Sequence, residues 1–312
     1  MTYAGQVKNE LARHEYGEKC CQAAELTAFI RLSGNIQISR QRIGLYVLTS
    51  SAAIARRIFS LFKKLFKLNS ELFVRRKVRL RKNNVYIIRL SGKAQVLEVL
   101  TKLELLQGDS PTQTISDTIY KNRCCCRAYL RGAFLAAGSI TNPENSYHLE
   151  IYTDYESHAE DLVRLMANFE LQGKVTTRKR GYLVYLKDSE QIAEFLNIIG
   201  AHGALLNFEN IRILKDMRNR VNRLVNFETA NMNKTVEASV RQLEVIRLID
   251  KEIGLEKLDP PLREVARLRL QHPEASLQEL GALLDPPLGK SGVNHRMRKL
   301  EKIGMGLQKK VR

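Results

Sequence analysis

Small side chains recur at helical spacing in two places along the chain. They stand every four residues at Ala128, Gly132 and Ala136, and again at Ala24 and Ala28. A stripe of this kind lets two helices approach more closely than the usual separation of about 8–10 Å. We therefore predict two helices that pack against each other along these stripes.

The two helices belong to an internal repeat. Residues 20–36 read CCQAAELTAFIRLSGNI and residues 124–140 read CCCRAYLRGAFLAAGSI, so that six of seventeen positions are identical at an offset of 104. Average composition would give roughly one identity. Each copy ends at a glycine, Gly34 or Gly138, directly before an extended segment. We predict two copies related by a pseudo-twofold axis; the alternative is a pair of unrelated helices that share small residues.

Each copy is followed by the same succession of patterns. Two strand-like segments, an amphipathic helix, a hairpin and another helix follow Gly34, and the same order follows Gly138. The predicted fold class is α+β, with two pseudosymmetric αββαββα halves. The first half, with an N-terminal helix, covers 1–107, the linker 108–123, and the second half 124–206.

The last third of the chain changes to helical periodicity only. An asparagine-rich helical connector is predicted over 207–257 and an all-α domain over 258–312. The spacing of Ser276 and Glu279 is typical of a capping box, and Ser291 is predicted to cap the last helix. Three short helices with a basic last helix favour a helix-turn-helix domain. The alternative is a three-helix bundle without a DNA-binding role.

The inward face of the predicted last helix consists of Val293, Met297 and Leu300. The residues that we predict to contact DNA occupy the remainder of this helix and the preceding turn and cap. They are Ser276, Glu279, Lys290, Ser291, Gly292, Asn294, His295, Arg296, Arg298, Lys299 and Lys302.

The asparagine-rich connector presents polar side chains along one helical face. Asparagine is a poor helix former unless its side chain has a partner. A hydrogen-bonded contact with another domain and direct contact with nucleic acid are equally favoured. Asn219, Asn222 and Asn226 lie along this face with Arg223 close by, and Asn231 belongs to the same segment.

Composition adds a strong charge bias. The chain of 312 residues contains 51 lysines and arginines against 33 acidic residues, a formal net charge of +18. Such an excess favours nucleic acid, an anionic membrane or an acidic protein as partner. No apolar run approaches the roughly 20 residues of a membrane-spanning helix, and the N-terminus has no signal-peptide pattern. We therefore expect a cytoplasmic protein without a membrane partner.

Much of the excess charge lies between Arg56 and Lys93. This stretch holds thirteen lysines and arginines, Arg57 among them, and one acid, Glu71. Strand periodicity places four of the cations on one sheet face, where they would repel one another without an anionic partner. We predict a phosphate-binding saddle; the alternative is a solvated edge whose charges oppose aggregation. The four cations are Arg75, Lys77, Arg79 and Arg81.

The cysteines stand side by side, as Cys20-Cys21 and Cys124-Cys125-Cys126. Adjacent cysteines make a poor disulfide framework and lack the spacing of common zinc sites. We predict reduced thiols that act as small apolar residues, in preference to a redox or metal role. No metal ligands and no cofactor are therefore expected.

The repeated helix resembles the LAGLIDADG homing endonuclease motif, at Leu26–Gly34 (LTAFIRLSG) and Leu130–Gly138 (LRGAFLAAG). In the nucleases, the penultimate motif position carries the acidic metal ligand. The positions here are Ser33 and Ala137, and neither can replace a carboxylate as a ligand for a hard cation. The resemblance therefore implies the scaffold without catalytic residues.

Over nearly its whole length the chain looks like a member of the WhiA family. The most specific segments are NRVNRLVNFETANMNK and PPLGKSGVNHRMRKLEKI. The resemblance implies a non-enzymatic, nucleoid-associated bacterial protein that binds double-stranded DNA, mainly through its helix-turn-helix. It further implies roles in cell division, chromosome segregation, transcription regulation or sporulation. Regulatory or division proteins would be partners, and no small-molecule substrate is implied.

Two other functions remain as alternatives. A metal-dependent endonuclease of the homing type is disfavoured by Ser33 and Ala137, because two carboxylates normally hold the metals. An RNA-binding protein is disfavoured because aromatic residues that could stack on bases are few and tryptophan is absent.

Overall fold

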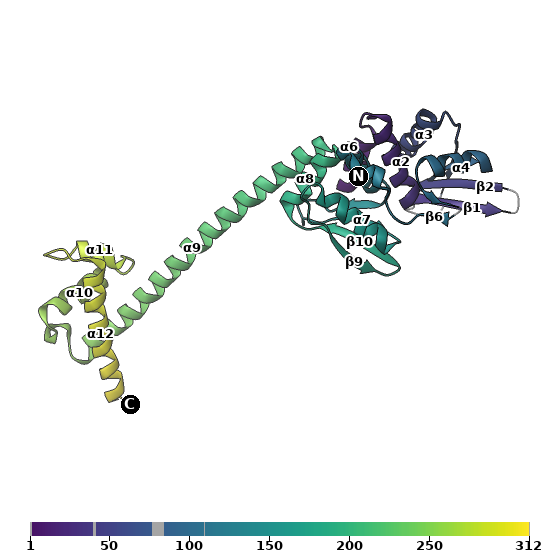
Figure 1. Cartoon of the computed structure of the whole chain (residues 1–312). Coiled ribbons are helices and arrows are strands. Elements are labelled where there is room, and N and C mark those ends of the chain that lie inside the picture. The colour runs from purple at the N-terminus through teal and green to yellow at the C-terminus, as the bar shows by residue number, and fades with distance from the viewer. Residues whose placement is uncertain (1, 40–41, 77–83, 109, 312) are drawn as a thin grey trace. The chain divides into compact units, whose positions relative to one another are not determined.

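The chain forms two compact units, residues 1–216 and residues 217–312. The computed structural model describes residues 2–39, 42–76, 84–108 and 110–311. Figure 1 shows sheets and helices in the first unit and helices in the second, which agrees with the predicted α+β class. Within the described ranges, no helix is both long and apolar enough to cross a membrane.

The predicted order αββαββα occurs twice in the first unit. The first half consists of α2 (Lys19–Ser33), β1 (Gly34–Ser39), β2 (Arg42–Thr49), α3 (Ala52–Phe66), β3 (Glu71–Arg75), β4 (Val85–Ser91) and α4 (Lys93–Lys102). The second half consists of α6 (Arg123–Ala137), β7 (Gly138–Ile140), β8 (Leu149–Thr153), α7 (Glu156–Ala167), β9 (Lys174–Arg178), β10 (Gly181–Leu186) and α8 (Ser189–Ile199). Both halves build antiparallel four-stranded sheets of equivalent order, β1-β2-β4-β3 and β7-β8-β10-β9. The predicted duplication is confirmed.

Shorter elements complete this unit. Helix α1 (Tyr3–Ala12) precedes the first half. Between the halves lie the strands β5 (Leu106–Gln107) and β6 (Ser110–Pro111) and the helix α5 (Asp117–Lys121). The side chain of Ser116 caps α5. The segment predicted as a linker therefore contains local structure of its own.

The glycines at the ends of α2 and α6 permit an abrupt change from helix to strand. Gly34 and Gly138 both have extended backbone angles and begin the next strand. A Cβ atom on Gly34 would overlap the carbonyl oxygen of Ile30, and one on Gly138 would overlap Phe134. The prediction that each helix ends at its glycine is confirmed.

Helices α2 and α6 pack closely along their small residues. A Cβ atom on Gly132 would lie 2.7 Å from the backbone oxygen of Glu25 and 3.0 Å from the Cβ of Ala28. Ala24 and Ala128 are also buried. The predicted close approach along the small-residue stripe is confirmed, and it places this helix pair in the core of the first unit.

A buried ion cluster links three helices of this unit. The carboxylate of Glu25 in α2 accepts hydrogen bonds from Arg57 of α3 and Arg131 of α6, and Glu25 and Arg57 are 2% and 1% exposed. Arg57 also donates to the carbonyl oxygen of His14 over 2.6 Å. Arg57 was counted in the cation-rich stretch between Arg56 and Lys93, but it adds no exposed charge there, because its guanidinium pairs with a buried carboxylate.

His158 is a second buried polar residue of the core. Its Nε2 lies 2.7 Å from the hydroxyl of Tyr129, and its Nδ1 lies 2.9 Å from the hydroxyl of Thr153. Burial lowers the pKa of His158 from 6.5 to about 3. The imidazole therefore stays neutral in the folded unit.

We expect the first unit to lose stability as the pH falls below the pKa of an unfolded histidine. The unfolded chain then binds a proton at His158 that the folded chain does not bind. The contribution of neutral His158 to the free energy of unfolding is therefore complete only above about pH 6.5. From pH 8 to pH 5 this proton should lower the free energy of unfolding by about 2 kcal/mol. Urea unfolding across this range measures the loss.

The matched variants for this measurement are His158→Gln and His202→Gln. His202 is exposed at the start of α9 (His202–Glu252). His158→Gln should flatten the pH dependence whatever its own stability, whereas His202→Gln should leave it unchanged. An unaltered pH dependence in His158→Gln would contradict the prediction.

The second unit is helical. Its elements are the end of α9 (His202–Glu252), a short 3-10 helix, η1 (Leu255–Lys257), and the helices α10 (Pro260–Gln271), α11 (Leu277–Ala282) and α12 (Lys290–Val311). Phe208 of α9 belongs to the hydrophobic core of the first unit, and Ile246 and Ile249 belong to that of the second. Helix α9 therefore contributes to both cores.

The predicted boundaries of the last helices are partly confirmed. Ser276 and Glu279 form the predicted capping box at the start of α11. Ser291 does not cap α12, because that helix already begins at Lys290. The backbone N–H groups of Gly292 and Val293 donate instead to the carbonyl oxygen of Gly289. Ser291 therefore lies in the first turn.

Candidate nucleic-acid interface

Helix α12 has one buried face and one exposed polar face. Val293, Met297 and Leu300 are at most 1% exposed and form the buried face, as predicted. With about 100° between successive residues of a helix, the opposite face is reached two residues later. The exposed residues on that opposite face are Ser291, His295, Arg298, Lys299 and Lys302. They form a continuous surface with three positive charges, which we call the α12 surface.

Other residues predicted to read DNA lie beside this surface. Lys290 is exposed at the first position of α12, and Gly292 and Asn294 are half-buried. Arg296 turns toward α10, where it lies 3.4 Å from the carbonyl oxygen of Pro261 and 4.0 Å from the carboxylate of Glu264. Its guanidinium is therefore engaged within the domain.

Ser276 and Glu279 are engaged with each other. The backbone N–H of Ser276 donates to Glu279 over 2.7 Å, and the backbone N–H of Glu279 donates to the hydroxyl of Ser276 over 3.2 Å. The first of these bonds lowers the pKa of the Glu279 carboxyl. Both side chains thus fix the start of α11.

The proposed saddle is only partly within the described residues. Arg75 is exposed at the end of β3, whereas Lys77, Arg79 and Arg81 lie outside the described residues. Nearby, the guanidinium of Arg89 lies 3.7 Å from the carboxylate of Glu71. Exposed apolar side chains accompany Arg75 on β3, namely Leu72, Phe73 and Val74. The described part of this sheet edge is therefore mixed apolar and cationic.

The equivalent strand of the second half also carries exposed cations. Lys174 and Arg178 are exposed on β9. The carboxylate of Glu150 lies 3.6 Å from Arg178 and 3.2 Å from His148. The carboxylate beside Arg178 weakens the attraction of this sheet for phosphates.

The asparagine-rich segment lies on α9. Asn219, Asn222, Arg223, Asn226 and Asn231 are all exposed there. On the side of the helix opposite Asn219, the apolar residues Met217, Val221 and Leu224 are 57–58% exposed. The segment therefore offers both amides and apolar groups to a partner.

The positions equivalent to the nuclease metal ligands are the last residues of α2 and α6. Ser33 ends α2 and Ala137 ends α6. Neither side chain carries a carboxylate, so the two helix ends offer no acidic pair to a magnesium ion. Ser33 and Ala137 are thus placed as the repeat predicts.

A group of cysteine side chains that the cysteine spacing did not predict lies at the opposite ends of the same helices. Cys20 and Cys21 lie in the first turn of α2, and Cys124 and Cys125 lie in the first turn of α6. The repeat itself contained the signal, because the offset of 104 aligns Cys20 with Cys124 and Cys21 with Cys125. Two helices packed side by side bring such equivalent positions together.

Three protein-family models match successive parts of the chain. They describe the WhiA N-terminal LAGLIDADG-like domain at residues 19–106, the WhiA LAGLIDADG-like domain at 126–218 and the WhiA C-terminal HTH domain at 221–304. The last match includes the part of α9 that packs into the second core.

Similar proteins cover nearly the whole chain. The "probable cell division protein WhiA" of Desulforamulus reducens is 54% identical and covers 99% of this chain and 97% of its own length. The protein of the same name from Bacillus licheniformis is 51% identical, with coverage of 99% and 98%. The crystal structure of full-length DUF199/WhiA from Thermatoga maritima superposes with a TM-score of 0.59, at 28% identity and 98% coverage of both chains.

Proposed function

Because the chain belongs to the WhiA family, we propose that it is a non-enzymatic protein that acts in cell division by binding double-stranded DNA. The α12 surface is its principal DNA reader. The observation that carries this proposal is the separation of α12 into a buried apolar face and an exposed face with Arg298, Lys299 and Lys302.

The residue types on the α12 surface suit the two kinds of contact that a recognition helix makes. Residues near the start of such a helix reach base edges in the major groove, where arginine can donate two hydrogen bonds to guanine. Ser291, His295 and Arg298 occupy the first three turns. Lys299 and Lys302 are suited to phosphate contacts, which set affinity and orientation.

The endonuclease alternative has less support. Metal-dependent cleavage requires carboxylates that hold the cations, and Ser33 and Ala137 stand at the two positions concerned. Incubation of the full chain with plasmid DNA and magnesium or manganese should leave the DNA intact. Cleavage that copurifies with this chain would overturn the non-enzymatic proposal.

The more specific functions are part of the same proposal. We assign the protein to the cytoplasm and the nucleoid, with chromosome segregation, transcription regulation or sporulation as the processes that DNA binding serves. The asparagine-rich face of α9 is an additional surface for DNA or for regulatory and division proteins. Chromatin immunoprecipitation with sequencing would test the nucleoid assignment.

The central prediction is a loss of DNA affinity in Arg298→Ala. Removing a side chain that reads a base should cost roughly 1–3 kcal/mol at a preferred site and relax the preference at one base pair. Titration of the full chain against a selected duplex and its single-base variants measures both effects.

Arg263→Ala is the matched control for Arg298→Ala. Arg263 lies in the same unit but on α10, where it donates to Glu256 over 2.8 Å. Its removal should leave DNA affinity unchanged. Equal losses in the two variants would mean that α12 is not the reader.

A salt series in the same titration tests the saddle. If the first sheet also contacts phosphates, joint neutralisation of Arg75, Lys77, Arg79 and Arg81 should weaken all duplexes similarly and reduce the salt dependence. An unchanged salt dependence would exclude the saddle from DNA binding. Loss of binding in this variant alone would make the saddle the main reader.

A further inference from the structure

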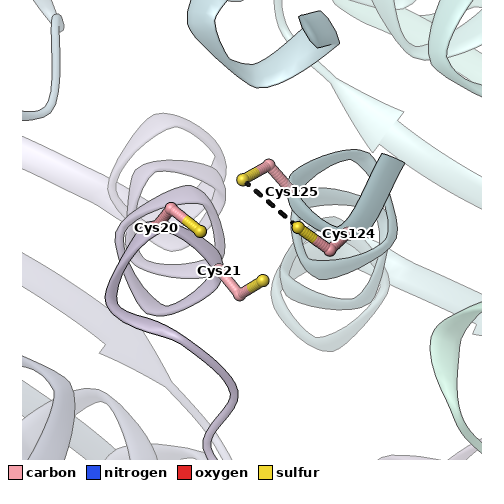
Figure 2. A group of neighbouring side chains, drawn as sticks. All are labelled: Cys20, Cys21, Cys124 and Cys125. Atoms are coloured by element: carbon pink, nitrogen blue, oxygen red, sulfur yellow. Dashed lines mark hydrogen bonds between the residues drawn. The ribbon is translucent and has the colours of Figure 1, made fainter. Parts of the chain in front are cut away.

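Four cysteine side chains converge where α2 and α6 begin. Figure 2 shows Cys20 and Cys21 from α2 facing Cys124 and Cys125 from α6 across the gap between the two helices. Their sulfur atoms all lie within 4.8 Å of one another, and the Sγ atoms of Cys124 and Cys125 are 4.0 Å apart. Among the described residues, this is the one group of three or more His, Cys, Asp or Glu side chains close enough to share a metal ion.

The fold dictates this convergence. Each half supplies one adjacent pair of cysteines at the first turn of its central helix, and the close packing along Gly132 holds the two helix starts together. Neither helix has a side chain that caps its first backbone N–H groups. Uncapped N–H groups at a helix start favour negative charge.

Apolar packing does not account for all four cysteines. Cys21 and Cys125 are 9% and 3% exposed, but Cys20 and Cys124 are exposed to solvent. The fifth cysteine differs, because Cys126 is 1% exposed and its Sγ donates to the carbonyl oxygen of Ile119 over 3.2 Å. The prediction of small apolar residues therefore suits Cys126 and fails for Cys20 and Cys124.

We propose that Cys20, Cys21, Cys124 and Cys125 form a tetrahedral site for one soft divalent cation, namely zinc. Thiolates are typical ligands of structural zinc, and bonds of about 2.3 Å separate the sulfur atoms of such a tetrahedron by about 3.8 Å. The observed separations of up to 4.8 Å need to contract by at most about 1 Å. An iron–sulfur cluster distributes its four cysteines over two or more iron atoms and therefore requires a wider arrangement.

Zinc binding would release the protons of the four thiols and leave a complex with a net charge of −2. The ion would join the two halves of the first unit by bonds between α2 and α6, in addition to their packing. The exposed Cys20 and Cys124 leave a path by which the ion enters. This site lies in the first unit, so the proposal does not depend on DNA binding by α12.

The test uses the full chain, purified with reductant and without chelator. Elemental analysis should find one zinc per chain. After removal of the metal, titration with cobalt(II) should produce the absorption bands of a tetrahedral cobalt–thiolate complex, saturate at one equivalent and reverse on addition of zinc.

Single substitutions separate ligands from the remaining thiol. Cys20→Ser and Cys124→Ser should each lower the cobalt affinity by at least about 10-fold, since each removes a ligand. Cys126→Ala retains the four ligands and should bind as the parent does. Absence of the cobalt–thiolate bands from the parent protein would overturn the proposal, as would stoichiometric iron with sulfide or ligand variants that bind normally.

Discussion

Glu25→Ala is expected to destabilise the first unit by about 3–5 kcal/mol. The substitution removes the one carboxylate between two guanidiniums, Arg57 and Arg131, and leaves their charges buried without a counterion. Calorimetry of the full chain should show the melting transition of the first unit lowered by roughly 6–20 °C. The second unit, with a core of its own, should melt as before.

Two variants test whether the loss comes from the buried charge. Glu25→Gln keeps most of the side-chain volume and should still be strongly destabilised. Glu98→Ala breaks the exposed pair with Lys102, whose N–O distance is 2.6 Å, and should cost about 0.5 kcal/mol or less. Wild-type stability of Glu25→Gln would show that packing, and not charge, explains the effect.

Gly281→Ala is expected to destabilise the second unit by about 3 kcal/mol, at the upper end for overpacking. A Cβ atom on Gly281 would overlap the carbonyl oxygen of Leu288 and lie 3.2 Å from Cγ2 of Val293. The turn between α11 and α12 contacts this glycine directly, since the N–H of Leu288 donates to the Gly281 carbonyl over 2.9 Å. The turn would have to move, and α12 with it.

The same variant links stability to the proposed function. Calorimetry should show the second transition lowered and the first unchanged, while DNA affinity falls at temperatures where the second unit has melted. Gly306→Ala in α12 is the matched control, because a Cβ atom there meets no atom within 4 Å. Alanine at Gly306 should stabilise the helix by up to about 1 kcal/mol. Similar melting of both variants would show that Gly281 does not hold the turn.

The features that sequence predicted correctly depend on local rules. The change from helix to strand at Gly34 and Gly138, the capping box of Ser276 and Glu279, and the buried face of α12 each follow from spacing within a few residues. The duplication itself was recognisable because six identities recur at one offset. Such signals suffice for the order of elements and for the face that each helix buries.

The features that sequence did not predict depend on contacts between distant segments. Arg57 stands in a stretch rich in cations, and its burial depends on Glu25, 32 residues earlier, and on the carbonyl oxygen of His14. The cysteine pairs resemble no metal-binding spacing within either copy, because each copy supplies half of the group. Ser291 matches the residue preference of a helix cap. The helix nevertheless starts before it, because the carbonyl oxygen of Gly289 accepts the hydrogen bonds of Gly292 and Val293.

The buried ion cluster has a consequence for how the duplicated fold can change. At the offset of 104, Glu25 is equivalent to Tyr129 and Arg131 is equivalent to Thr27, so the cluster occurs once and has no counterpart in the other half. Tyr129 instead contacts His158. A homodimer of the first half would contain two Glu25 carboxylates with Arg57 but without Arg131. A homodimer of the second half would contain Arg131 but no equivalent of Glu25. The two halves therefore have different interiors, and a dimer of one half could not reproduce the ion cluster.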